Sequence, residues 1–129
     1  MIKLLLLYVW QFPQEIIGSF LVLILKGKRT KYGIIGIYTV PNFFHSGISL
    51  GDYIIFDSRI ELSEIDVMHE YGHQLQSRFL GPLYLLIVGI TSLIGNIYSR
   101  IKNKSDTWYY SRFPENWADK LGGVNSRIL

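Results

Sequence analysis

The chain has 129 residues, enough for one domain over residues 1–129 and too few for two independent hydrophobic cores. Hydrophobic residues make up 49% and charged residues only 18%, and the net charge of +3 comes from short basic clusters that follow apolar runs. This pattern favours a lipid bilayer as a partner and argues against nucleic acid. Cysteine is absent, which excludes disulfides and thiolate metal ligands.

Residues 1–25 form a first apolar segment, which Pro13, Gln14 and Glu15 interrupt. Neither half is long enough to span a bilayer, because a spanning helix needs about 20 apolar residues. We expect either one kinked crossing or two short helices that lie in the membrane interface. Basic residues follow at positions 26–31, and such clusters favour the cytoplasmic side for the part of the chain that comes next.

Residues 33–57 are rich in β-branched and aromatic residues, and turn-forming pairs punctuate them at Pro41-Asn42, Ser46-Gly47 and Gly51-Asp52. This composition predicts two or three short antiparallel strands. Helices are predicted on both sides of the strands along the chain. The expected fold class is therefore α+β.

A helix is predicted over residues 63–79. Ser63, followed three residues later by Asp66, is typical of a helix N-cap, and Gly81-Pro82 is typical of a helix end.

The same predicted helix carries His69, Glu70 and His73 in the pattern HExxH. Residues four apart lie on one face of a helix, so the two imidazoles can bind one zinc ion while Glu70 reaches a metal-bound water. The pattern predicts a catalytic zinc centre with Glu70 as the general base. The third histidine, His45, is predicted to be a turn residue that binds no metal.

A second apolar segment covers residues 80–98 and contains no charged residue. Its length would span a bilayer, but Pro82, Gly89 and Gly95 interrupt it. A re-entrant hairpin or a pair of buried helices therefore fits as well as a simple crossing. A single full crossing would place His73 and the C-terminal part of the chain on opposite sides of the membrane.

A helix is predicted over residues 114–121, between Pro114 and Gly122-Gly123. A catalytic zinc ion usually keeps three protein ligands, and Glu115 is the best candidate for the third. Asp119 lies on the same helical face and could accept the outer N–H of a ligand histidine. Asp119 and Asp106 remain alternative third ligands.

The HExxH pattern and the sequence ExxAD from Glu115 to Asp119 resemble the two motifs of the gluzincins, a group of zincin metallopeptidases. The likeness is greatest to membrane-bound gluzincins such as the CAAX prenyl proteases and the membrane heat-shock proteases. The resemblance implies a minimal zincin fold that binds Zn²⁺ through His69, His73 and Glu115. It also implies that Glu70 is the catalytic base and that Asp119 orients a histidine.

Tyr109, Tyr110 and Arg112 precede the last predicted helix, and one of them could donate a hydrogen bond to the oxyanion formed in acyl transfer. A strand from Ile48 to Phe56 would offer an edge on which an extended peptide could add.

These features predict a membrane-associated zinc metallopeptidase, active on a peptide or protein substrate at the cytoplasmic face. Three other functions fit the same sequence. They are a non-catalytic membrane protein that zinc stabilises, a membrane adaptor without metal, and a metal amidase that acts on a non-peptide amide.

Overall fold

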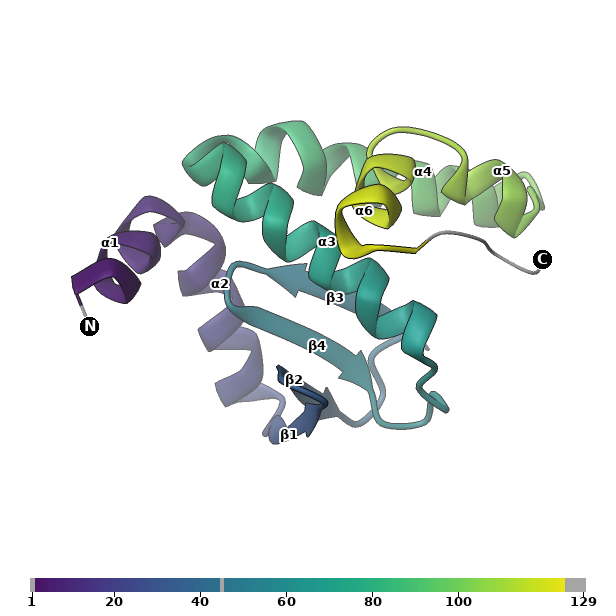
Figure 1. Cartoon of the computed structure of the whole chain (residues 1–129). Helices are drawn as coiled ribbons and strands as arrows, with labels where there is room; N and C mark the ends of the chain where they lie inside the picture. The colour runs from purple at the N-terminus through teal and green to yellow at the C-terminus, as the bar shows by residue number, and fades with distance from the viewer. Residues whose placement is uncertain (1, 45, 125–129) are drawn as a thin grey trace.

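The computed structural model describes residues 2–44 and 46–124, which form an α+β fold of a four-stranded sheet and flanking helices (Figure 1). In Figure 1, α3 (Glu64–Leu80) runs across the sheet and α6 (Glu115–Gly122) lies beside α3. Helix α4 (Ile90–Ile101) passes above α3, and α1 (Ile2–Trp10) lies at one side. The strands are β1 (Lys28–Tyr32), β2 (Ile35–Val40), β3 (Gly47–Leu50) and β4 (Tyr53–Asp57). The helices are α1 (Ile2–Trp10), α2 (Phe12–Ile24), α3 (Glu64–Leu80), the 3-10 helix η1 (Gly81–Leu83), the π-helix η2 (Leu85–Gly89), α4 (Ile90–Ile101), α5 (Asp106–Tyr110) and α6 (Glu115–Gly122).

The sheet differs from the prediction in size and direction. Its strand order is β1-β2-β4-β3, and β2 pairs with β4 in parallel while the outer pairs are antiparallel. Three strands lie within residues 33–57, as predicted, but the prediction of antiparallel pairing was wrong for β2 and β4 and the sheet has a fourth strand. The prediction missed β1 because every residue of this basic strand is exposed, so the sequence shows no apolar alternation, and charged side chains are common on such an edge strand. The predicted single strand from Ile48 to Phe56 is in fact the β3–β4 hairpin, of which only β3 lies at an edge.

The hydrophobic core lies between the sheet and α3, where Ile37, Ile54, Phe56 and Val67 pack together. Helix α3 begins as predicted, because the Ser63 hydroxyl accepts a hydrogen bond from the Asp66 amide while the Asp66 carboxylate accepts one from the Ser63 amide. This reciprocal cap fixes where the metal-motif helix starts. The packed core beneath it fixes which face of the helix turns away from the sheet.

Helices α3 and α6 approach each other closely enough for their backbones to touch. A Cβ atom added at Gly72 would collide with the carbonyl oxygen of Ala118, and one added at Gly122 would collide with the carbonyl oxygen of Met68. These two glycines therefore set the distance between the helix that carries HExxH and the helix that carries Glu115. Helix α6 lies within one residue of its predicted range, and Gly123 ends it with a φ of 81°.

The first apolar segment forms two helices, and its polar residues attach them to α3. Gln14 donates hydrogen bonds to the Ser77 hydroxyl at 2.9 Å and to the Gly81 carbonyl at 2.8 Å. The Ser77 hydroxyl in turn donates to Gln11, and the Trp10 indole donates to the Arg78 carbonyl. The polar residues that interrupt the apolar run thus attach α1 and α2 to the C-terminal half of α3.

Neither apolar segment contains a straight helix long enough to cross a bilayer. Within residues 2–44 and 46–124, only two helix pairs reach the required length and apolar character, and they are bent by 92° (α1 with α2) and 119° (α3–η1 with η2–α4). The second bend turns α4 back along α3.

Glu15 is fully buried against the β3–β4 turn, where one carboxylate oxygen accepts the Asp52 amide at 2.7 Å and the other has no hydrogen-bond partner. Burial and the nearby Asp52 charge raise the pKa of Glu15 to about 8, while Arg78 opposes the shift. A raised carboxyl pKa means that the fold prefers the neutral form. Its contribution to stability is complete below about pH 4.5 and is lost as the pH rises toward 8.

We expect Glu15→Gln to unfold at a higher temperature than the wild type at pH 8, by roughly 5 °C, and at nearly the same temperature at pH 5. The glutamine side chain keeps an oxygen that can accept the hydrogen bond of the Asp52 backbone amide, and it never ionises. Thermal unfolding followed by circular dichroism measures the difference. Glu61→Gln, at an exposed position, controls for the lost negative charge. A stabilisation that is equal at both pH values would contradict this account of Glu15.

Candidate metal centre

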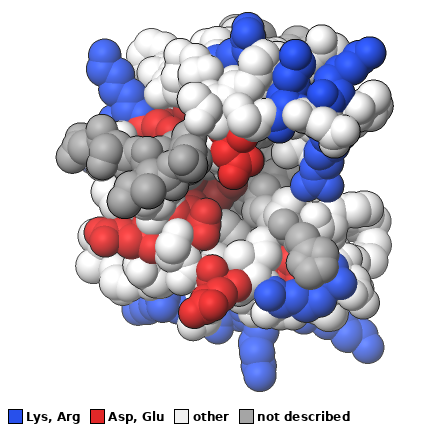
Figure 2. All heavy atoms as spheres, turned by 90° about the vertical axis from the view of Figure 1, so that its right-hand side faces the viewer, with Lys and Arg blue, Asp and Glu red and all other residues white. Residues whose placement is uncertain are grey.

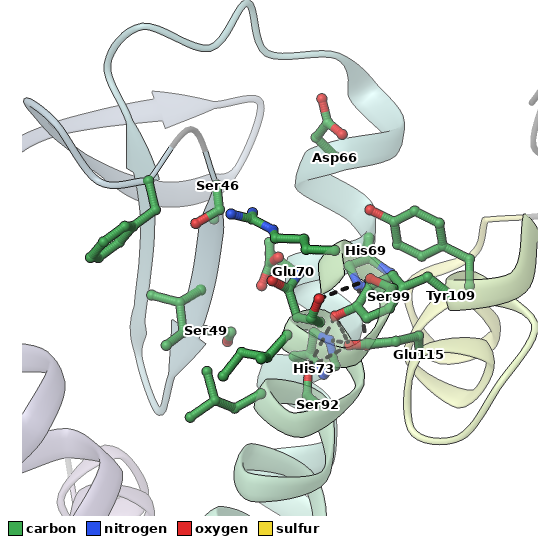
Figure 3. A pocket seen from close by; sticks show the side chains of 18 of the residues that line it. Ser46, Ser49, Asp66, His69, Glu70, His73, Ser92, Ser99, Tyr109 and Glu115 are labelled. Atoms are coloured by element: carbon green, nitrogen blue, oxygen red, sulfur yellow. Dashed lines mark hydrogen bonds and ion pairs between the residues drawn. The ribbon is translucent and has the colours of Figure 1, made fainter. Parts of the chain in front are cut away.

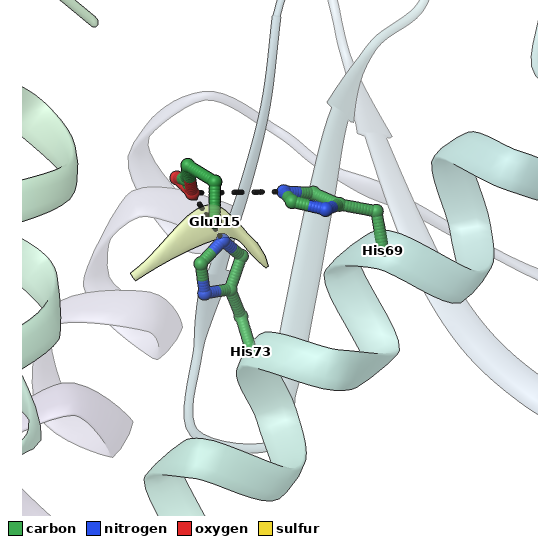
Figure 4. Close-up of side chains that lie close together, drawn as sticks. All are labelled: His69, His73 and Glu115. Carbon is green, nitrogen blue, oxygen red and sulfur yellow. Dashed lines mark ion pairs between the residues drawn. The ribbon is translucent and has the colours of Figure 1, made fainter. Parts of the chain in front are cut away.

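His69, His73 and Glu115 come together between α3 and α6 (Figure 4). All three are buried, and one ligand atom from each lies within 4.8 Å of the others. The Glu115 Oε2 atom lies 3.1 Å from His73 Nε2 and 3.8 Å from His69 Nε2. The structure thus assembles the three residues that were predicted as metal ligands. Asp106, one of the alternatives, lies exposed at the start of α5.

Asp119, the other alternative, lies on the outer side of the cluster. Its Oδ1 atom is 2.6 Å from Nδ1 of His69. A carboxylate in this position accepts the Nδ1–H and leaves the Nε2 lone pair free to face inward. This is the arrangement expected of the residue that orients a ligand histidine.

Gln76 does the same for His73, and sequence reasoning missed it. The Gln76 amide nitrogen donates to the Pro114 carbonyl at 3.1 Å, which leaves its Oε1 to face His73 Nδ1 at 2.7 Å. Because Oε1 can only accept, Nδ1 of His73 carries a proton and the neutral ring keeps its lone pair on Nε2. Gln76 also joins α3 to the start of α6. Its position three residues after His73, on the same helical face, was a usable signal.

Glu115 is held by one of its two oxygens only. Oε1 accepts hydrogen bonds from Ser92 at 2.5 Å and from Tyr109 at 2.8 Å, whereas buried Oε2 has no hydrogen-bond partner. Two imidazole nitrogens and one carboxylate oxygen, all facing inward, form the donor set that zinc prefers in catalytic centres. The unsatisfied Oε2 atom therefore fits a cation bound between the three side chains.

The charges of this cluster are coupled. Burial opposes ionisation of Glu115, but the close contact with His73 and the charge on both histidines lower its pKa. Burial likewise opposes protonation of His73, but Glu115 and Glu70 raise its pKa. The Glu115 carboxylate and the His73 ring thus influence each other's charge, and a bound cation would compete with a proton for the space between them.

Glu70 lies on α3, as His69 and His73 do. Its side chain points toward the open side of the cluster of His69, His73 and Glu115 (Figure 3). It is buried, and its Oε2 atom has no hydrogen-bond partner. Burial raises the pKa of Glu70, the two histidines lower it, and Glu115 raises it again. A carboxylate with a raised pKa and an unused oxygen is suited to accepting a proton near neutral pH.

A cleft of about 1010 Å³ opens beside these residues, bordered by β3, the loop that precedes it, α3 and α4. Asp66 and Asp106 line its outer part together with Arg100 and Lys104. Figure 2 shows acidic side chains gathered round a hollow in one face of the molecule, with lysine and arginine side chains farther out. His69, His73 and Glu115 are part of its lining, so a molecule bound in the cleft would reach the cluster.

The three predicted oxyanion donors occupy different environments. The Tyr109 hydroxyl donates to Glu115, and burial together with the Glu115 charge raises its pKa, so the hydroxyl keeps its proton. The Tyr110 ring packs edge-on against His69, with ring centroids 5.1 Å apart, and lines the cleft. The Arg112 guanidinium stacks on the Trp108 ring at 4.4 Å. His45 lies outside the described residues.

No known family model, curated protein or solved structure matches this chain. The chemistry of the site is therefore inferred from its own residues. Those residues provide three buried inward-facing ligand atoms, a buried carboxylate beside them and an adjoining cleft.

Proposed function

We propose that this protein is a zinc-dependent metallopeptidase of the zincin type. One observation carries the proposal: each metal-facing side chain is held from behind by a hydrogen bond, so that three ligand atoms converge within 4.8 Å. Fixing ligands by outer hydrogen bonds is typical of protein zinc centres, and solvated acidic residues on a helix surface do not need it. The resemblance of HExxH and ExxAD to gluzincin motifs supports the same assignment.

Zinc, when bound by His69, His73 and Glu115, supplies a Lewis acid and lowers the pKa of a coordinated water to about 7. Glu70 is placed to take the proton of the attacking water on its free Oε2 atom. As the C–N bond breaks, Glu70 returns that proton to the leaving nitrogen. Asp119 and Gln76 keep both histidines in the tautomer that leaves Nε2 unprotonated.

An extended peptide is the proposed substrate, because the cleft runs along the edge strand β3. A chain added to this edge would pair with free backbone groups of β3 beside the metal-motif helix. The Tyr84 hydroxyl already donates to the Ser49 carbonyl at 2.9 Å, so the pairing is restricted to the other groups of the strand. A non-catalytic zinc centre would need neither Glu70 nor this cleft.

Zinc content tests the metal site. Detergent-purified wild-type protein, reconstituted with zinc and dialysed, is expected to hold one zinc ion per chain by elemental analysis. His73→Ala and Glu115→Gln should hold far less, because each removes one of three ligand atoms. Zinc-free wild-type protein after reconstitution would refute the proposal, and full occupancy in Glu115→Gln would remove Glu115 from the ligand set.

The proposed location is the cytoplasmic surface of a membrane. Large apolar side chains are exposed along α1 and α2, and also along α4, where they include Ile90, Ile94 and Ile101. Helices with apolar outer faces and nearby basic residues bind at the lipid interface. The Trp10 ring at the end of α1 contacts Gly81 and donates to the Arg78 carbonyl, which holds α1 against the end of α3 from which η2 and α4 continue.

Vesicle flotation tests this location. The wild-type protein is expected to float with vesicles that contain anionic phospholipid, and Leu5→Glu should reduce the bound fraction at least about tenfold because a charge is costly in the apolar layer. Leu5 is 63% exposed on α1. Ile34→Glu is the matched control, since Ile34 is 99% exposed in the β1–β2 turn, away from the apolar helices. Equal loss in both variants, or no binding by the wild type, would contradict the proposal.

A further inference from the structure

The carboxylate of Glu115 is held by two hydroxyl groups from parts of the chain outside both motifs. Ser92 comes from α4 and Tyr109 from α5, and both donate to the same oxygen, Oε1. The two hydroxyl oxygens are themselves only 3.3 Å apart. Figure 3 shows both side chains reaching Glu115 from different elements. Two donors on one oxygen define the orientation of the whole carboxylate.

The other oxygen, Oε2, is left as the atom that faces the histidines. It is buried, lies 3.1 Å from Nε2 of His73, and has no hydrogen-bond partner. Without the two hydroxyls the carboxylate could rotate about its last side-chain bond and present both oxygens, or neither, to the same point. Ser92 and Tyr109 thus hold the Glu115 carboxylate in one orientation, in which only Oε2 faces the histidines.

We infer that Ser92 and Tyr109 are positioning residues that hold Glu115 as a ligand through one oxygen, which makes α4 a structural part of the metal centre. The inference rests on the proposed function, because it assumes that a metal ion binds at this cluster. It also gives the second apolar segment a role beyond contact with lipid. A hydroxyl in the middle of an apolar run is costly in a bilayer or a core unless it has a partner, and the partner here is Glu115.

Zinc affinity of single variants tests the inference. We expect Ser92→Ala and Tyr109→Phe each to weaken zinc binding by roughly 10-fold to 100-fold in competition with a chromophoric chelator, the usual effect of losing an outer hydrogen bond to a ligand. The double variant should bind more weakly than either single variant. Tyr109→Phe removes one oxygen atom and keeps the ring, so it remains informative even if Ser92→Ala folds poorly.

A spectrum separates positioning from a general loss of stability. In cobalt-substituted protein, the wild type is expected to show the intense visible bands of a four-coordinate ion, and both variants weaker bands because a released carboxylate can bind through two oxygens. Ser99→Ala and Tyr98→Phe are the matched controls. Ser99 lies on the same helix but donates to the Asn96 carbonyl, and Tyr98 is half exposed against Trp108.

The outcomes distinguish this inference from the proposed function. Weaker zinc binding and changed cobalt bands in both test variants, with unchanged controls, would support the positioning role. Unchanged affinity and unchanged bands in Ser92→Ala and Tyr109→Phe, in a protein that does bind zinc, would overturn the role and leave the metal centre standing. A wild-type protein that binds neither metal would overturn both.

Discussion

Replacing Glu70 by glutamine is expected to lower peptide hydrolysis by about 10²-fold to 10⁴-fold, the usual contribution of a general base. The same variant should still hold one zinc ion per chain. Glu70 lies beside the ligand cluster but is not one of its members, and glutamine has nearly the same shape. Hydrolysis of a quenched peptide library and elemental analysis on the same sample measure the two quantities.

Glu64→Gln is the control for this experiment, since Glu64 is an exposed residue in the first turn of the same helix. It should keep both zinc and hydrolysis. A Glu70→Gln protein that hydrolyses peptides at the wild-type rate would remove Glu70 from the mechanism. A wild-type protein that holds zinc but cleaves no peptide would instead favour the amidase or the zinc-stabilised membrane protein.

Gly72→Ala is expected to destabilise the fold by about 3 kcal/mol and to abolish zinc binding, because overpacking at a fixed backbone contact is costly. The added methyl group would collide with the Ala118 carbonyl, so α6 must move away from α3. Glu115 would then move away from His69 and His73. Thermal unfolding and zinc content of the same preparation measure both effects.

Gly95→Ala provides the matched control on α4. A Cβ atom there would meet only the Tyr109 ring, at an ordinary distance of 3.8 Å, and alanine favours a helix over glycine. We expect a gain of about 0.5–1 kcal/mol and unchanged zinc content. Equal behaviour of the two alanine variants would show that the contact between α3 and α6 does not control the site.

The local features of this protein were readable from the sequence. Ser63 and Asp66 predicted the start of α3, and Gly122-Gly123 predicted the end of α6, because a cap and a left-handed glycine depend on a few neighbouring residues. The spacing of His69 and His73 placed both on one helical face for the same reason. The α+β class followed from where the strand-forming and helix-forming stretches occur.

The strand order of the sheet and the bend between α3 and α4 could not be predicted locally, because both depend on contacts between distant parts of the chain. The parallel pairing of β2 with β4, and the exposed basic strand β1, left no pattern because strand order and direction depend on long-range contacts. The sharp turn between α3 and α4 was likewise one of several arrangements compatible with residues 80–98.

The candidate metal centre likewise has some features that the sequence predicts and others that only the tertiary structure shows. The sequence by itself determined the chemical types and helical spacing of its ligands, because HExxH and ExxAD act within single helices. Only the tertiary structure decided that α3 and α6 meet at Gly72, that Gln76 faces His73, and that Ser92 and Tyr109 converge on one oxygen of Glu115. These contacts join residues from separate elements, and their geometry depends on how the helices pack around the shared core.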